Sequence, residues 1–363
     1  MSNVRASHWP GIAEVGEMKS APFVSLNFLE RAAEPGSPFH RDYLAYQRRE
    51  ITRAELIRQL PHVAMLGDSV CMGIHISSPW STFWRAHTCR GKNWFLHRDA
   101  PRETCSIAKT LESITPLVAI ECAGVGALVD HEYSRQDLFR RILGTRNFSA
   151  QVSDLLRAFR FPDLILIAIG HNNVDWAWRC PPNDFVEPHE RLKRLSEDLR
   201  QNYRRDLRRL LERARTQQRR VAIVIYGLIN FESYFKGREA AERLRESDRT
   251  LYPRLDTTYK YFISFHPTYR LNLVRLASIV NEKLHAMVKE LNCEFVQQTE
   301  HIQLRYSDAL ATADLGRAEL LHPIDGWHAS VEGHNVLANA AVSDLAPSLE
   351  FLGIGDSHRL KSR

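Results

Sequence analysis

The sequence predicts an α/β fold, a three-layer α/β/α sandwich around a central, mostly parallel sheet of five strands. Five short apolar runs have the composition of strands covered on both faces. Segments with helical spacing of leucine and valine lie between several of these runs. Glycine and small polar residues follow the first three runs directly. Strands that alternate with helices favour a parallel sheet with helices on both of its faces.

The strands are expected at the apolar runs themselves. Each run is five or six residues long, which is the usual length of a strand in a globular protein. Valine, isoleucine and leucine dominate the second, third and fourth runs, as expected for a buried parallel sheet. The five runs are residues 62–66, 117–122, 164–169, 221–226 and 293–297.

Four segments are expected to be helical, and the last of them follows residues 329–333. The first, residues 41–60, precedes the first strand. In residues 191–220, leucines recur at helical spacing and the arginines between them alternate with acidic residues. Residues 273–291 keep a helical period of leucine, valine and methionine. The alternating charges of 191–220 favour an amphipathic helix with a solvated polar face over a nucleic-acid surface.

The 363 residues suffice for one large α/β domain with insertions or for two modest domains, and we favour one domain with additions. We expect a partly helical N-terminal extension at residues 1–60 and a C-terminal tail at residues 349–363. The domain between them, residues 61–348, carries two insertions rich in aromatic and charged residues, near 79–104 and 230–267. Long insertions in a compact domain commonly act as lids or substrate walls.

The composition is that of a soluble globular protein, with 44% hydrophobic and 25% charged residues. The net charge of +6 comes without aromatic interleaving or a nucleic-acid-binding signature. No segment reads as a signal peptide or a membrane span. Six scattered cysteines without a CxxC pair suggest neither a zinc module nor a disulfide framework. We therefore expect a cytoplasmic protein without metal, organic cofactor, nucleic acid or membrane span, and the oligomeric state stays open.

A candidate nucleophile follows the first strand, in Gly67-Asp68-Ser69. The carboxyl ends of parallel strands are where such sheets bind ligands, so Ser69 is expected to face a crevice. An alternative is that Ser69 merely caps the next helix, because serine is a favoured N-cap residue. The same tripeptide recurs at Gly355-Asp356-Ser357, after the last expected helix, where we interpret it as part of a tail.

Partners for Ser69 follow later elements. Asn172, just after the third strand, carries an amide that can donate a hydrogen bond to an oxyanion. Asp325-Gly326-Trp327-His328 precedes the last expected helix. The spacing of three residues lets one turn hold a carboxylate beside an imidazole, which is what an activated serine requires.

In their order and placement, these blocks resemble the SGNH hydrolases, also called the GDSL esterase/lipase superfamily. The resemblance spans about residues 62–345 and implies the flavodoxin-like SGNH fold. It also implies that Ser69 is the nucleophile, His328 the general base and acid, and Asp325 its orienting partner. Asn172 is similar to the asparagine of the family's oxyanion hole, with the Ser69 backbone N–H as a second donor.

The glycine of the family's oxyanion hole falls within residues 123–127, where Gly126 aligns best and Gly124 is the fallback. An ordinary tight turn is the other interpretation of the two glycines, and it is compatible with the first because one turn can also expose an N–H. The chain departs from the family pattern at two positions: Glu121 replaces the usual asparagine of the second block, and Asn173 replaces the aspartate that usually follows Gly-x-Asn.

Other residues near these blocks have two interpretations. His171 and Trp327 are candidate substrate contacts, although a histidine in such a loop more often serves as a local hydrogen-bond partner. His334 is expected to face outward or to pack within the last helix. The tryptophans near the site can line an acyl or sugar pocket, although core packing is more common for any one of them. They are Trp80, Trp84, Trp94, Trp176, Trp178 and Trp327.

The resemblance implies an ester hydrolase of the esterase, lipase or deacetylase type, which acts on a small-molecule or glycan ester through an acyl-enzyme. Two alternatives stay open. An O-acyltransferase uses the same residues with a different acceptor. A catalytically inactive binding or scaffold protein on the same fold is the other, and the two departures at Glu121 and Asn173 favour it.

Overall fold

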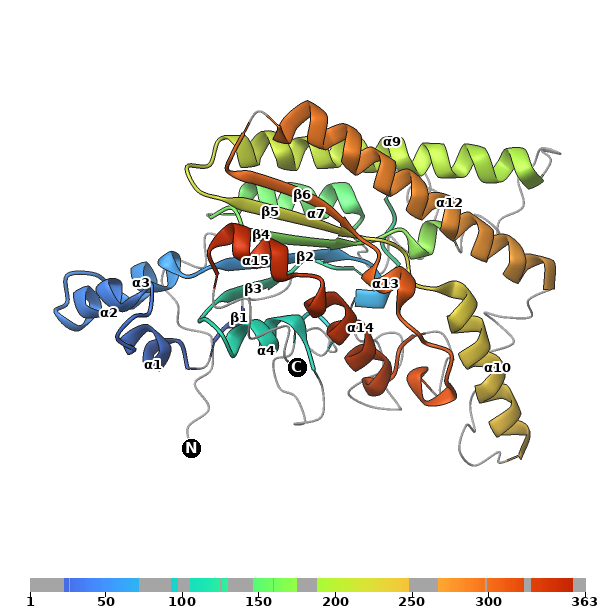
Figure 1. Cartoon of the computed structure of the whole chain (residues 1–363), viewed down its shortest axis with the longest axis horizontal. Coiled ribbons are helices and arrows are strands. Elements are labelled where there is room, and N and C mark those ends of the chain that lie inside the picture. The colour runs from blue at the N-terminus through green and yellow to red at the C-terminus, as the bar shows by residue number, and fades with distance from the viewer. Residues whose placement is uncertain are drawn as a thin grey trace.

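The structure is a computed structural model of the whole chain (Figure 1). It describes residues 23–25, 27–71, 93–96, 105–124, 126–129, 146–158, 160–174, 188–247, 267–297, 299–322 and 328–354.

A six-stranded sheet forms the centre of the molecule, in the order β1-β3-β2-β4-β5-β6. Five strands are parallel, which confirms the predicted α/β fold, and the two-residue β1 adds an antiparallel edge beside β3. The strands are β1 (Phe23–Val24), β2 (His62–Gly67), β3 (Val118–Glu121), β4 (Leu164–Ala168), β5 (Val221–Tyr226) and β6 (Ile302–Ser307).

The strand order places a topological switch point at β2. From β2 the chain moves to β3 on one side, and it then crosses to β4 on the other side of β2. Connections that leave a strand in opposite directions open a crevice at its carboxyl end, and open α/β sheets bind ligands there. The residues that follow β2, β3 and β4 therefore meet at one place.

The fifth parallel strand lies later in the chain than predicted. Of residues 293–297, expected as a strand, 293–296 instead belong to a π-helical turn, Asn292–Val296, and β6 follows at Ile302–Ser307. The prediction was wrong because the strand at this edge of the sheet has no continuous apolar run. As an edge strand, β6 buries Ile302 and Leu304 but leaves Gln303 and Arg305 partly exposed.

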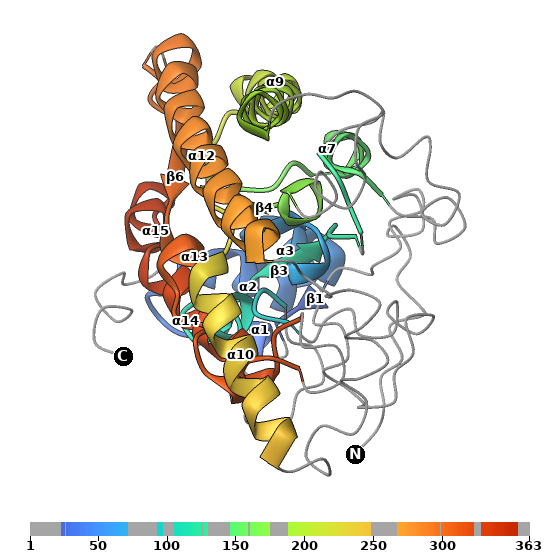
Figure 2. The ribbon, with the colours of Figure 1, turned by 90° about the vertical axis from the view of Figure 1, so that its right-hand side faces the viewer.

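Helices cover both faces of the sheet (Figures 1 and 2). On one face, α7 (Phe148–Arg157) contacts β2, whereas α9 (Pro188–Arg215) and α12 (Pro267–Leu291) contact each other and β6. On the other face lie α4 (Ile107–Glu112), α14 (Val331–Ser343) and α15 (Ala346–Leu352). The helices α10 (Phe231–Ser247) and α13 (Ala309–Thr312) follow β5 and β6, at the right-hand end of Figure 1.

The N-terminal helices lie at the opposite end of the sheet (Figure 1, left): α1 (Phe28–Ala33), α2 (His40–Gln47) and α3 (Arg53–Gln59). The single helix predicted at residues 41–60 is wrong, because α2 and α3 are separate. Arg49 breaks the helix with a left-handed φ of 60°. A capping box then starts α3, in which the Thr52 and Glu55 side chains each bind the other's backbone N–H.

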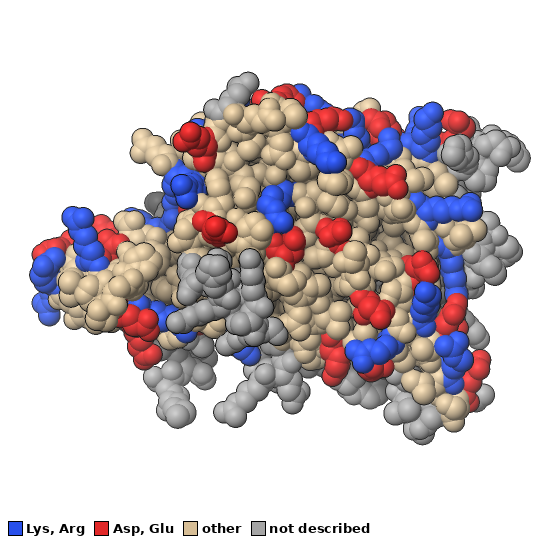
Figure 3. All heavy atoms as spheres, viewed as in Figure 1, with Lys and Arg blue, Asp and Glu red and all other residues tan. Residues whose placement is uncertain are grey.

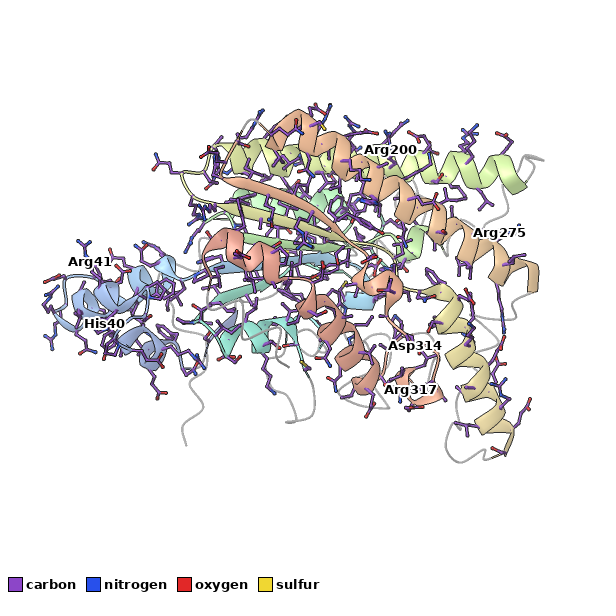
Figure 4. All side chains as sticks on the ribbon, in the orientation of Figure 1. His40, Arg41, Arg200, Arg275, Asp314 and Arg317 are labelled. Atoms are coloured by element: carbon purple, nitrogen blue, oxygen red, sulfur yellow. The ribbon has the colours of Figure 1, made fainter. Side chains whose placement is uncertain are left out.

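The arginine-rich segment predicted as a helix forms α9, and its leucines face the core. Its arginines pair with acidic side chains. Arg200 lies 3.0 Å from Glu290 of α12 (Figure 4), and Arg204 binds both Glu290 and Glu294. Figure 3 shows blue and red side chains interleaved along this upper edge. The arginines of α9 therefore form ion pairs that join α9 to α12.

His62 makes the stability of the fold depend on pH. Its ring is 2% exposed, and burial, followed by the charges of Arg160 and Arg219, lowers the pKa of His62 from 6.5 to about 3. The unfolded chain binds this proton below about pH 6.5, whereas the folded protein binds it only near pH 3, so acid lowers the free energy of unfolding across that window.

We expect the wild type to lose about 2 kcal/mol more unfolding free energy than His62→Leu between pH 7 and pH 5. Urea unfolding of both proteins at the two pH values measures this difference. The comparison is made within each protein, so any constant cost of the leucine cancels. Equal losses in the two proteins would mean that His62 is not kept neutral by the fold.

Candidate active site

Ser69 lies on a sharp turn at the end of β2, where it begins the 3-10 helix Ser69–Cys71. Gly67 makes this turn possible. A Cβ at this position would lie 2.5 Å from Cys71 Sγ and 2.8 Å from the Ala168 carbonyl oxygen. Ser69 itself is 5% exposed. The turn therefore holds the serine at the carboxyl end of the central strand, with little freedom to move.

Gln151 of α7 fixes the same turn, and sequence reasoning missed it. Its side-chain amide donates to the Gly67 carbonyl oxygen at 2.8 Å and accepts from the Gly67 N–H at 2.9 Å. The side chain is completely buried between Phe148 and Val152 on the apolar face of the helix. A glutamine at a buried helical position is the signal that points to such a role, because buried polar groups need partners.

The glycine turn after β3 lies beside the nucleophile turn. The Gly124 N–H donates to the Gly67 carbonyl oxygen at 3.0 Å, and the Ala127 N–H donates to the Gly124 carbonyl oxygen at 3.1 Å. Gly126 has a φ of +67°, a conformation that favours glycine. The Gly124 N–H is thus bonded to the end of β2. It is therefore not available as an oxyanion donor, and Gly126 remains the candidate donor of this turn.

The loop after β4 joins the glycine turn through two adjacent asparagines. The Asn172 side-chain amide donates to the Ala127 carbonyl oxygen at 3.1 Å, and the Asn173 side-chain oxygen accepts from the Val129 N–H at 2.9 Å. Asn173 stands where the family usually has aspartate. The atom that binds Val129 is the side-chain oxygen, so the substitution keeps an acceptor at this position.

Asp68, the residue before Ser69, connects the nucleophile turn to the loop after β4. One oxygen, Oδ1, accepts from the Val70 N–H at 3.1 Å. The other, Oδ2, accepts from the Gly170 N–H at 3.2 Å, the His171 N–H at 3.1 Å and the His171 ring Nδ1 at 2.9 Å. Asp68 is completely buried, so these four bonds take the place of water.

Glu121, the other departure from the family pattern, has an amide partner from a distant segment. Asn93 donates its side-chain N–H to Glu121 at 2.7 Å, and its oxygen accepts the N–H groups of Phe95 and Leu96 at 2.8 Å. In the next residue, Trp94, the indole N–H donates to the Val70 carbonyl oxygen at 3.2 Å. Residues 93–96, within the predicted insertion near 79–104, are thus buried in the core and contact Val70, the residue after Ser69.

Cys71 is the nearest thiol to Ser69 in sequence. Burial, followed by the charge of Asp68, raises the pKa of the Cys71 thiol well above its ordinary range. The thiol donates to the Ala168 carbonyl oxygen at 3.2 Å. A protonated and buried thiol is a poor nucleophile, so Cys71 does not compete with the serine.

His328 lies shortly before α14 in the chain. The His322 N–H donates to the His328 carbonyl oxygen at 2.8 Å, and Leu321 pairs with Ala329. Ser330 then caps α14 by accepting from the Gly333 N–H at 3.1 Å. These contacts fix the backbone on the C-terminal side of the predicted triad.

Several predicted residues have different outcomes. Asp325 and Trp327 lie outside the described residues, as do the tryptophans at 80, 84, 176 and 178. Trp94 is a fully buried core residue. His334 packs within the fold, where its Nδ1 accepts from the Trp94 N–H at 3.2 Å. The tail tripeptide with Ser357 also lies outside the described residues.

In the part of the chain that the structure describes, no group of three or more histidine, cysteine, aspartate or glutamate side chains could hold a metal ion, and no helix is long and apolar enough to cross a membrane.

Residues 63–341 match the family model of the GDSL-like lipases/acylhydrolases, and the chain belongs to this family. Membership supports an ester hydrolase. The structure is similar to an extracellular lipase from Streptomyces rimosus, with 14% identity, a TM-score of 0.42 and coverage of 80% of this chain and 99% of that one. It is also similar to the lipase Lip_vut3 from a goat rumen metagenome, with 14% identity, a TM-score of 0.39 and coverage of 82% and 99%. A comparison with curated protein sequences gives no match.

Proposed function

We propose that this protein is a serine ester hydrolase that works through a Ser69-His328-Asp325 triad and an acyl-enzyme. His328 takes the proton of the Ser69 hydroxyl as its oxygen attacks the ester carbonyl carbon. It then gives the proton to the departing alcohol. Water, activated by the same imidazole, attacks the acyl-enzyme and releases the acid. Asp325 orients the imidazole and stabilises its charged form.

The proposed oxyanion hole consists of the Ser69 and Gly126 backbone N–H groups and the Asn172 side-chain amide. The hydrogen bond from the Gly124 N–H to Gly67 favours Gly126 over Gly124 as the second donor. Gly126 also has a φ of +67°, a conformation that favours glycine, which gives a reason for glycine at this position. Each donor of this kind contributes about 2.7 to 4 kcal/mol of transition-state stabilisation.

One observation carries the proposal: the loops after β2, β3 and β4 are bonded to one another at the switch point of the sheet. The Asn172 amide reaches Ala127 of the glycine turn, and Asp68 reaches Gly170 and His171. Three sequence blocks separated by about fifty residues each thus meet around Ser69. Attack and charge stabilisation require this proximity.

The two departures from the family pattern also fit catalysis. Asn173 keeps the acceptor for Val129, and Glu121 binds Asn93. Glu121 and Asn173, the two departures that favoured an inactive scaffold, are thus compatible with an active enzyme. The substrate class proposed here is a small-molecule or glycan ester. Its acyl group is best identified by testing the wild type against a panel of acyl chain lengths and acetylated glycans.

A fluorophosphonate probe tests the nucleophile directly, because it phosphonylates an activated serine and stays bound. We expect one adduct per chain, located on Ser69 by mass spectrometry of the peptides. Ser357→Ala is the matched control, because it removes the serine of the second Gly-Asp-Ser and should be labelled as fast as the wild type. An adduct on Ser357, or a wild type that resists the probe, would contradict the proposal.

A further inference from the structure

His171 forms a bridge between two strand-end loops. Its Nδ1 lies 2.9 Å from Asp68 Oδ2, and its Nε2 lies 3.2 Å from the backbone nitrogen of Ile229, just after β5. Both His171 and Asp68 are buried, at 2% and 0% exposure. The ring therefore joins the end of β2 to the end of β5 from its place at the end of β4.

The two contacts define which ring nitrogen carries the hydrogen. The Ile229 N–H can only donate, so Nε2 is the acceptor and has no hydrogen. Nδ1 then carries the hydrogen of the neutral ring and donates it to the Asp68 carboxylate. Flipping the ring would put Cδ2 and Cε1 in the places of Nδ1 and Nε2 and break both hydrogen bonds, which favours the observed orientation.

The Asp68 oxygen that binds the ring also binds the backbone of the same loop. Oδ2 accepts the N–H groups of Gly170 and His171, and Gly170 has a φ of +125°, a conformation that side-chain-bearing residues rarely adopt. The ring and backbone of His171 thus hold one carboxylate oxygen together. These two bonds fix the position of the first of the helical residues 171–174.

Asn172 is the next residue on that helical turn. Its amide nitrogen lies 3.1 Å from the Ala127 carbonyl oxygen, at the glycine turn. We infer that His171 is a positioning residue, which acts through its bond to Asp68 to hold the Asn172 amide where the oxyanion develops. This inference rests on the proposed function. Because protein groups occupy both ring nitrogens, His171 does not serve as a substrate contact.

A positioning role of this kind affects turnover more than substrate binding. Negative charge on the substrate oxygen appears only as the transition state forms, so a misplaced donor lowers kcat and leaves KM nearly unchanged. A displacement of about 1 Å at a reacting centre can cost about 100-fold in rate. The loss on disturbing His171 is therefore expected to be about 10- to 100-fold in kcat.

Three substitutions separate the two arms of the bridge. In His171→Asn, the side-chain amide occupies the place of Nδ1 and keeps the bond to Asp68. In His171→Gln, the amide reaches the place of Nε2 and keeps the bond to Ile229. His171→Leu removes both. We expect kcat of the asparagine variant to stay within about threefold of the wild type, while the glutamine and leucine variants lose about 10- to 100-fold with KM nearly constant.

Asn281 of α12 provides a control for general loosening of the loop after β5. Its side chain accepts from the Leu228 N–H at 2.7 Å and donates to the Leu228 carbonyl oxygen at 3.3 Å, with no bond to Asp68. Asn281→Ala should leave kcat within about threefold of the wild type. A loss of kcat equal to that of His171→Gln would mean that the loop after β5, rather than the Asp68 bond, sets the rate.

Steady-state kinetics with a p-nitrophenyl ester, and the rate of fluorophosphonate labelling, are measured on all variants. Full kcat in the glutamine variant with a loss in the asparagine variant would overturn the inference, as would a raised KM at constant kcat. If the leucine variant does not fold, the comparison of the asparagine and glutamine variants still tests the inference. A wild type that neither hydrolyses nor labels would refute the proposed function, whereas an active wild type with unaffected His171 variants would refute only this inference.

Discussion

Replacing the Ser69 hydroxyl with hydrogen, in Ser69→Ala, is expected to lower kcat/KM for a p-nitrophenyl ester by about 10⁴-fold or more. The loss is large because no acyl-enzyme can form without the attacking oxygen. A small residual rate above that in water is expected, since the Asn172 amide and the Gly126 N–H still stabilise the oxyanion when water attacks directly. The measurement is initial-rate hydrolysis with wild type and variant at equal concentration.

The substitution is well suited to this test because Ser69 can lose its oxygen without disturbing the turn. The hydrogen bonds that hold the turn come from the backbone and from the neighbouring Asp68 and Gln151 side chains. The melting temperature of Ser69→Ala should therefore stay close to that of the wild type. Undiminished turnover in a folded Ser69→Ala protein would mean that another residue is the nucleophile. We expect Ser357→Ala to keep the wild-type rate, and it would be the next variant to assay in that case.

The sequence allowed the main parts of this site to be predicted because each part directly follows a strand. In a parallel sheet the carboxyl ends of the strands share one edge, so residues after β2, β3 and β4 are brought together by the topology alone. Asp68-Ser69, the glycine turn and Asn172 are in these positions. The bonds between the loops, by contrast, depend on side-chain directions that spacing does not define.

The residues that sequence reasoning missed do not react themselves but bind the strand ends next to the proposed reacting groups. Gln151 is 84 residues from the Gly67 peptide that it binds, and Asn93 is 28 residues from Glu121. Each of these contacts joins a helix or an insertion to a strand end, and no local pattern encodes such a pairing. A buried polar residue on an apolar helix face was visible at Gln151, but its partner could be identified only in the folded chain.

The edge strand shows a second limit of pattern reading. Apolar runs identify strands that are covered on both faces, and β2, β4 and β5 are fully buried. At the edge, β6 is covered less completely, and its sequence alternates. The apolar run that was chosen instead, residues 293–297, is the end of a helix. For Asp325 the sequence remains the only guide, and its role stays a prediction.

His328→Ala is expected to cost about as much as Ser69→Ala, roughly 10⁴-fold or more in kcat/KM, because neither residue works without the other. The serine needs the imidazole to take its proton, and the imidazole has no reaction to assist without the serine. The double variant Ser69→Ala/His328→Ala should therefore be no slower than either single variant, within about threefold. Non-additivity of this size indicates that two residues act in one step.

The variant Asp325→Ala distinguishes a catalytic triad from a mechanism that needs only the serine and the histidine. Loss of the carboxylate leaves the imidazole able to accept a proton but poorly oriented, so this variant should retain about 10- to 100-fold more activity than His328→Ala. His285→Ala, on the exposed side of α12, is the matched histidine control and should keep the wild-type rate. If the Ser69 and His328 losses multiply in the double variant, the two residues act independently and the base must be another group. If Asp325→Ala is as active as the wild type, the imidazole takes its orientation from the fixed backbone around Ala329 and Ser330 alone.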